Sequence, residues 1–293
     1  MLNQHTDLAL EARELWQESA GETTKLPGVR AREHKVRGVT VTVVEILDAQ
    51  GAQALRKPVG TYVTLELEKG LLREPAGFSR AAAQLGRELA RLIPQEGPVL
   101  VAGLGNAAVT PDAIGPRALD HLVVTRHLGA NFPRLRAVIA MAPGVLGTTG
   151  LESVEVIRGL VERAQPVCVV VVDALASRSP ERLCSTVQLA TTGITPGSGV
   201  GNRRAAFDRQ TLGVPVLAVG VPTVVEASTL LHDTLEQAGA GTARHRISFD
   251  RTLVVTPRDI DARVGQISRL LGYGISLGLH RSLSMADVSC FVG

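Results

Sequence analysis

Residues 98–116 read PVLVAGLGNAAVTPDAIGP, and this stretch predicts the fold of the chain. Residues 99–102 are apolar and indicate a buried strand, which turns through Gly103 and Gly105 before the chain reaches Asp112. Open α/β sheets bind their ligands just past the carboxyl ends of their strands. We therefore expect an α/β fold whose chemistry involves Asp112.

A second apolar run, at residues 167–172, is the longest in the chain and ends at Asp173. Uninterrupted β-branched runs are typical of central parallel strands that are covered on both faces. The carboxyl ends of parallel strands meet at one edge of a sheet. We therefore expect Asp173 at the end of its strand and on the same edge as Asp112.

The remaining pattern alternates between strands and helices. We expect strands at residues 39–46, 60–67, 136–141, 185–192, 214–220 and 253–255. Helices are expected at residues 5–20, 78–93, 116–128, 153–164, 224–238 and 257–278. No internal repeat or low-complexity linker divides the sequence. The expected architecture is a single domain with a central, mostly parallel sheet, flanked by helices on both faces.

The composition excludes several classes of protein. The 293 residues include 31 basic and 28 acidic side chains, and this balance is too even for a nucleic-acid footprint. The longest apolar run is far shorter than the roughly 20 residues that cross a bilayer, and the N-terminus lacks the features of a secretion signal. Cys168, Cys184 and Cys290 form no metal or disulfide motif. We expect a cytoplasmic protein without a membrane segment or direct nucleic-acid contact.

The pair Asp112 and Asp173 is the main catalytic hypothesis. A single aspartate after a strand often serves only as a helix cap, but two at one edge of a sheet favour chemistry. Nearby carboxylates share a proton, so that one acts as a general base toward water and the other as a general acid. The same geometry would suit a metal ion, with His127 as a third ligand.

The glycine turn also fits a dinucleotide-binding pattern, because Gly103, Gly105 and Ala108 directly follow a strand. Two features argue against that site. Pro111 interrupts the helix that should bind the pyrophosphate, and the strand at residues 136–141 ends in Ala-Pro-Gly where a ribose-binding acid is expected. The loop TPGSGVGNRR at residues 195–204 lacks phosphate-loop spacing and is interpreted as a surface loop.

Several long motifs resemble one known family. They are GLGNAAVTPDAIGPRALDHLVVTRHL, APGVLGTTGLES, VVDALASR, TTGITPGSGVGNRR, LGVPVLAVGVPTVVEA and LVVTPRDID. Together they resemble the germination protease of spore-forming bacteria, the endopeptidase that degrades small acid-soluble spore proteins. The resemblance extends from residue 6 to about residue 280, nearly the whole chain.

The resemblance implies an atypical aspartic endopeptidase without a cofactor, made as an inactive zymogen and assembled as a homotetramer in the spore cytoplasm. It also implies a fold similar to that of the hydrogenase maturation endopeptidases. The family's two essential aspartates lie in its VTPDA and DALA motifs, which correspond here to Asp112 and Asp173. The sequence reasoning and the resemblance therefore select the same pair.

The N-terminal residues TDLALE are similar to the sequence at which the family cuts its substrates. We expect self-cleavage between Asp7 and Leu8, with residues 1–7 as a propeptide and residues 8–293 as the peptidase domain. An acidic residue before the cut should need a cation, for which Arg126, Arg178 and Arg203 are candidates.

The glycine turns at residues 103–106 and 144–150 are candidates to donate backbone N–H groups to the substrate. The expected substrate contacts are Gly105, Asn106, His127 and Arg178. Two alternatives remain open: a metal-binding maturation endopeptidase that uses Asp112, Asp173 and His127, and a non-enzymatic dinucleotide-binding or regulatory protein.

Overall fold

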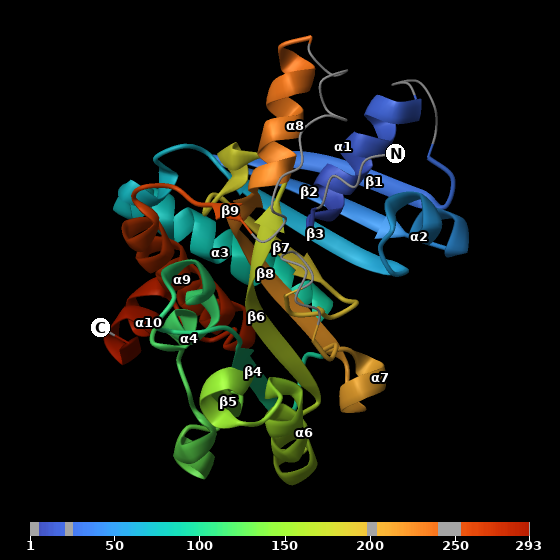
Figure 1. Cartoon of the computed structure of the whole chain (residues 1–293). Coiled ribbons are helices and arrows are strands. Elements are labelled where there is room, and N and C mark those ends of the chain that lie inside the picture. Colours follow the sequence, from blue (N-terminus) through green and yellow to red (C-terminus); the bar gives the residue numbers. More distant parts are fainter. Residues whose placement is uncertain (1–5, 21–25, 198–203, 240–252, 293) are drawn as a thin grey trace.

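The computed structural model describes residues 6–20, 26–197, 204–239 and 253–292, and in these residues nine strands form one sheet (Figure 1). The strands are β1 (Val29–Val36), β2 (Val39–Ile46), β3 (Gly60–Leu67), β4 (Val99–Gly103), β5 (Val138–Met141), β6 (Cys168–Ser177), β7 (Thr186–Ala190), β8 (Val216–Glu226) and β9 (Val254–Val255). Their order across the sheet is β1-β2-β3-β7-β8-β6-β4-β5, and β9 pairs with β8. β6, which carries Asp173, is thus an inner strand.

Helices lie before the first strand, between later strands and after the last of them. They are α1 (Ala9–Ala20), α2 (Ala49–Leu55), α3 (Pro75–Leu92), α4 (Ile114–Leu119), α5 (Leu146–Thr149), α6 (Ser153–Ala164), α7 (Arg209–Leu212), α8 (Ala227–Gln237), α9 (Ile260–Leu279) and α10 (Met285–Val292). Short 3-10 turns lie at Leu71–Arg73, Thr110–Asp112, Arg126–Asn131 and Pro180–Arg182. Among the described residues, none of these helices combines the length and apolar character that a bilayer crossing requires.

The sheet is mixed, and the expectation of a mostly parallel sheet is wrong. β8, β6, β4 and β5 run parallel to one another, whereas β1, β2, β3, β7 and β8 form a run of antiparallel pairs. β1 and β2 are joined by Arg37 and Gly38, whose φ angles are 44° and 92°. Positive φ at both positions of a two-residue turn produces a tight hairpin, and a tight hairpin makes its strands antiparallel.

Side chains from both faces of the sheet are buried, as expected. On one face, Val170 and Val172 join the core cluster that α3 and α9 cover. On the other face, Val169 and Val171 join a cluster that includes side chains of α6 and α7, and α1 packs on the neighbouring part of the same face. Because successive residues of a strand point to opposite faces, Asp173 shares the face of Val169 and Val171. This is the face that carries α1.

Most expected elements are present, and β2, β3 and α6 have the predicted bounds. The helix expected at residues 116–128 is wrong beyond α4. There the chain is held in place by neighbours instead: Val123 N donates to Ser276 Oγ, and Thr125 N and Oγ1 bond to the backbone of Val138. These contacts replace the hydrogen bonds that a continuing helix would make.

Two strands are longer than expected. β6 continues past Val172 to Ser177, and β8 continues to Glu226, through residues 224–226 that were expected to be helical. The two strands extend together because their ladder continues beyond Asp173, with one register shift near Leu175. Asp173 therefore lies within β6 rather than at its end, which corrects the sequence-based expectation.

Candidate active site

Asp112 is held by the turn that follows β4. Gly105 has a φ of 107°, and a Cβ atom there would lie 1.9 Å from the Asp112 backbone oxygen, so only glycine fits. The next residue, Asn106, donates its backbone N–H to Asp112 Oδ2 at 2.7 Å. The turn thus fixes both the backbone and the carboxylate of Asp112.

Asp173 lies on β6 between β4 and β8, and its side chain is only 4% exposed. Its Oδ1 atom accepts a hydrogen bond from the N–H of Ala174 at 2.9 Å. The turn after β4 is tied to the same strand, because Leu104 N donates to Val172 O at 2.8 Å. This bond places the turn that carries Asp112 beside Asp173.

The two carboxylates line one cavity of about 310 Å³. Asp7 and Glu152 add further carboxylates to its wall, and Arg204 contributes a cation. Apolar side chains form much of the remaining wall: Leu104, Val109, Val145, Leu175, Ile194, Phe207, Val224 and Val254. The cavity therefore combines an apolar lining with a few charged groups, which is typical of a ligand-binding site.

Burial raises the pKa of Asp173 well above its usual range, and the charge of Asp112 raises this pKa further. The N–H of Ala174 acts in the opposite direction, and the Asp7 carboxylate adds to the rise. Burial also raises the pKa of Asp112, although the N–H of Asn106 and the charge of Arg204 oppose this rise. The pair therefore keeps a proton to higher pH than isolated aspartates, as a general acid and base require.

The N-terminal segment crosses the sheet face beside this cavity. Asp7 N donates to Ala176 O at 3.0 Å, and Ala176 N donates to Asp7 Oδ2 at 2.9 Å. The next residue, Leu8, is completely buried. Asp7, the residue before the expected cut, is thus docked on β6 and lines the same cavity as Asp173.

The cation beside this segment is one that the sequence analysis did not select. Lys57 Nζ donates to the backbone oxygen of Thr6 at 3.1 Å. Burial lowers the pKa of Lys57, while the carboxylates of Asp7 and Glu11 raise it. Lys57 therefore lies within electrostatic reach of the acidic residue that precedes the expected cut.

Arg126, Arg178 and His127, which were expected to contact the substrate, do not line the cavity. Arg178 is engaged by Asp233 and Glu18, each at 2.9 Å, and in the described residues it is not part of the cavity wall. Arg126 and His127 are exposed in the 3-10 turn after α4, also away from that wall. Arg203 lies outside the residues that the structure describes.

Of the two glycine turns, the first is used differently from the expectation. The N–H of Asn106 bonds to Asp112 itself, so this donor positions the carboxylate rather than the substrate. In the second turn, Val145 lines the cavity. Within the described parts of the chain, no three His, Cys, Asp or Glu side chains are grouped so as to hold a metal ion, and His127 is not near the aspartates.

Four residues at or near this site were not selected as site residues from the sequence: Glu11, Lys57, Gln188 and Arg204. Gln188 is a buried polar residue in the apolar strand β7, Glu11 is buried in the amphipathic helix α1, and only the tertiary structure reveals their partners. Arg204 ends the glycine-rich loop at residues 195–204, whose position beside the aspartates could not be deduced from its composition.

Comparisons with known proteins identify one family throughout. The family profile described as "Germination protease" (Peptidase_A25) matches residues 9–238. A germination protease from Caldanaerobacter subterraneus subsp. tengcongensis is 42% identical, with 99% of this chain and 98% of that protein aligned. A germination protease from Clostridium perfringens is 39% identical over the full length of both chains.

Two further comparisons cover less of the chain. The germination protease of Priestia megaterium is 41% identical across 79% of this chain and 66% of that protein. Among solved structures, the [NiFe] hydrogenase maturation protease HycI from Thermococcus kodakarensis KOD1 aligns with 64% of this chain and 98% of its own. That structural match has 15% identity and a TM-score of 0.37.

Proposed function

The chain belongs to the germination protease family, peptidase family A25, and on this premise we propose that it degrades small acid-soluble spore proteins during germination. It is an endopeptidase by family. The observation that carries the proposed chemistry is that Asp112 and Asp173 line one cavity, with the pKa of each raised. We assign these two side chains as the catalytic pair.

The reaction uses the pair as base and acid. The ionised carboxylate takes a proton from water while the water oxygen attacks the carbonyl carbon of the substrate. The protonated partner then gives its proton to the amide nitrogen as the C–N bond breaks. Proton transfer of this kind contributes about 10²- to 10⁴-fold to a rate, so each carboxylate should be required.

The first substrate is the chain itself, cut between Asp7 and Leu8. Support comes from the docked segment, in which Asp7 lines the cavity and Leu8 is completely buried. Residues 1–7 then form a propeptide, and the uncut chain is the zymogen. Of this propeptide, Thr6 and Asp7 lie within the described residues.

The acidic residue before the cut is recognised by a backbone donor and a cation. In the docked segment, the Asp7 carboxylate accepts from Ala176 N, and Lys57 lies within electrostatic reach. We assign these groups as the subsite for the acidic side chain of the substrate, in place of Arg126 and Arg178. A homotetramer and a location in the spore cytoplasm complete the proposal and rest on the family alone.

The test is to incubate the chain with a small acid-soluble spore protein and to identify the cut sites by mass spectrometry. Cuts after acidic residues are expected, and Asp112→Asn or Asp173→Asn should slow them at least about 100-fold. Asp120→Asn, which changes an exposed aspartate at the end of α4, is the matched control and should keep the wild-type rate. Retention of most activity in either catalytic variant would contradict the assignment.

A further inference from the structure

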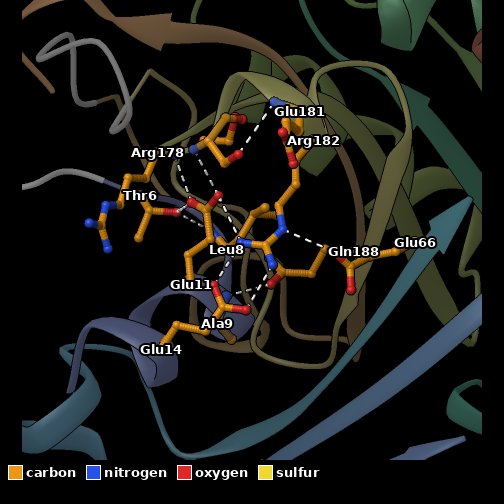
Figure 2. A network of polar contacts seen from close by, with 12 residues as sticks. Thr6, Leu8, Ala9, Glu11, Glu14, Glu66, Arg178, Glu181, Arg182 and Gln188 are labelled. Atoms are coloured by element: carbon orange, nitrogen blue, oxygen red, sulfur yellow. Dashed lines mark hydrogen bonds and ion pairs between the residues drawn. The ribbon is translucent and has the colours of Figure 1, made fainter. Parts of the chain in front are cut away.

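The side chain of Gln188 contacts the N-terminal segment on both sides of the Asp7–Leu8 bond. Its Nε2 atom donates to the backbone oxygen of Asp7 at 3.1 Å, and its Oε1 atom accepts from Ala9 N at 2.7 Å. Figure 2 shows Gln188 beside Leu8 and Ala9. The two partners also fix the orientation of the amide, because a carbonyl only accepts and an N–H only donates.

Gln188 shares a row of the sheet with Asp173. It pairs with Gly220 of β8, and on the other side Gly220 pairs with Asp173 of β6. Residues paired across neighbouring strands point to the same face, so the side chains of Gln188 and Asp173 flank the glycine on one face. With strands about 4.8 Å apart, the two backbones are separated by roughly 10 Å. This spacing leaves room for one extended peptide between the two side chains.

We propose that Gln188 is the residue that positions and polarises the peptide bond to be cut. The proposal rests on the self-cleavage proposed above. The Nε2 group holds the oxygen of the reacting carbonyl and stabilises the negative charge that develops there when water attacks. The Oε1 atom holds the N–H of the second residue after the bond, which fixes the register of the substrate on the sheet.

A buried glutamine could instead serve only to satisfy polar groups in the core. Gln188 is 5% exposed, so its amide needs partners in any case. Two features separate the proposed role from this simpler one. The two partners belong to the successive peptide groups on either side of Leu8, the first of which is the bond to be cut. Asp7, which supplies the carbonyl of that bond, lines the same cavity as Asp173.

The first experiment measures the self-cleavage rate of the full-length chain by intact mass. Gln188→Met keeps the size of the side chain and removes both hydrogen bonds. Loss of one oxyanion donor typically slows a hydrolase about 10²- to 10³-fold, and we expect a decrease of at least about 100-fold. Thr186→Val is the matched control, since Thr186 is a buried polar residue on the same strand and face. It should cleave at the wild-type rate.

The second experiment separates positioning from polarisation. In the Asp173→Asn background, where the segment is not cut, hydrogen exchange of residues 6–11 reports how firmly it is docked. We expect Gln188→Met to raise this exchange by a few-fold only, so that the loss in cleavage rate exceeds the loss in docking. Rate and docking that fall by the same factor would overturn the polarising role. Unfolding midpoints show that each variant is folded.

The outcomes also distinguish this inference from the function on which it rests. A wild-type chain that keeps residues 1–7, or an Asp173→Asn chain that loses them, contradicts the proposed function. A wild-type chain that cuts between Asp7 and Leu8, with a Gln188→Met variant that cuts equally fast, overturns the role of Gln188 alone. Slow cleavage in Gln188→Met with normal cleavage in Thr186→Val supports it.

Discussion

Asp173, the buried member of the proposed catalytic pair, opposes the stability of its own fold. Burial and the neighbouring carboxylate raise its pKa, so the folded chain binds a proton here more tightly than the unfolded chain does. By linkage, the contribution of this group to stability falls as the pH rises from the unfolded pKa toward the folded one. At neutral pH the carboxyl is therefore a source of instability.

The prediction is that Asp173→Asn abolishes cleavage and raises the unfolding midpoint at neutral pH, on the order of a few degrees. The asparagine oxygen still accepts from Ala174 N, while the cost of a buried charge disappears. The difference in unfolding midpoint between the variant and the wild type should vanish at low pH, because Asp173 is then protonated and as uncharged as asparagine. Thermal unfolding between pH 4 and pH 8 checks this, and a variant less stable than wild type at every pH would contradict it.

Gly105 offers a second test at the residue scale. Gly105→Ala places a Cβ atom 1.9 Å from the Asp112 backbone oxygen at a φ of 107°, so the turn must shift and move the carboxylate. We expect a loss of at least about 1–2 kcal/mol in the free energy of unfolding, together with loss of cleavage. Gly213→Ala is the control, because Gly213 also has a positive φ but open space around it. That variant should lose stability and keep its activity.

At the scale of elements, α1 is anchored by one buried carboxylate (Figure 2). Glu11 is 1% exposed and accepts from Arg178 N at 2.7 Å, Ser179 N at 3.1 Å and Arg182 Nη1 at 3.2 Å. Arg182 also bonds to Glu14 and Glu66, so it ties α1 to β3 as well as to its own turn. The first turn of α1 is thereby fixed to the connection between β6 and β7.

Glu11→Ala should release α1 from the sheet. It leaves Arg182 and two backbone donors without this partner, and loss of one member of a buried ion pair typically costs about 3–5 kcal/mol. We expect faster proteolysis within residues 9–20 and slower self-cleavage. Glu18→Gln is the control, because the Glu18 side chain is 59% exposed and pairs with Arg178 at the surface. Equal proteolysis in the two variants would contradict the anchoring role.

The elements also show where sequence reasoning succeeds and where it fails. Apolar patterns correctly predicted β2, β3 and α6, and they selected Asp112 and Asp173, which the structure places on one cavity. The end of β6 was misplaced because its pairing with β8 continues beyond the apolar run. β1, α2 and α10 were not expected at all, and β1 has the polar sequence VRAREHKV because most of it faces solvent. The partners of the buried Gln188 are also set by tertiary contacts rather than by a local pattern.

At the scale of the whole molecule, the residues of the candidate site come from both the parallel and the antiparallel part of the mixed sheet. The parallel strands β4 and β6 carry or precede the two aspartates, while β7, in the antiparallel part, carries Gln188. β8 joins the two parts, and its Gly220 separates Asp173 from Gln188. The candidate site therefore lies where parallel pairing changes to antiparallel pairing.

This arrangement predicts that α1 stays docked after residues 1–7 are removed. The contacts of Glu11 with Arg178, Ser179 and Arg182 lie on the retained side of the cut. Hydrogen exchange of residues 12–18 should therefore be equal before and after self-cleavage, within a factor of about three, which corresponds to about 0.6 kcal/mol. Loss of protection throughout α1 after the cut would show that residues 6 and 7 hold the helix instead.

The wide separation in sequence between Ala9 and Gln188, 179 positions, has a consequence for synthesis of the chain. The N-terminal segment is synthesised first. The part of the sheet on which it docks consists of β6, β7 and the intervening β8, and β8 ends at Glu226. Until translation has passed that residue, the Asp7–Leu8 bond has no completed site in its own chain. If the chain is cut as proposed, the order in which its strands are made delays that cut until the sheet is complete.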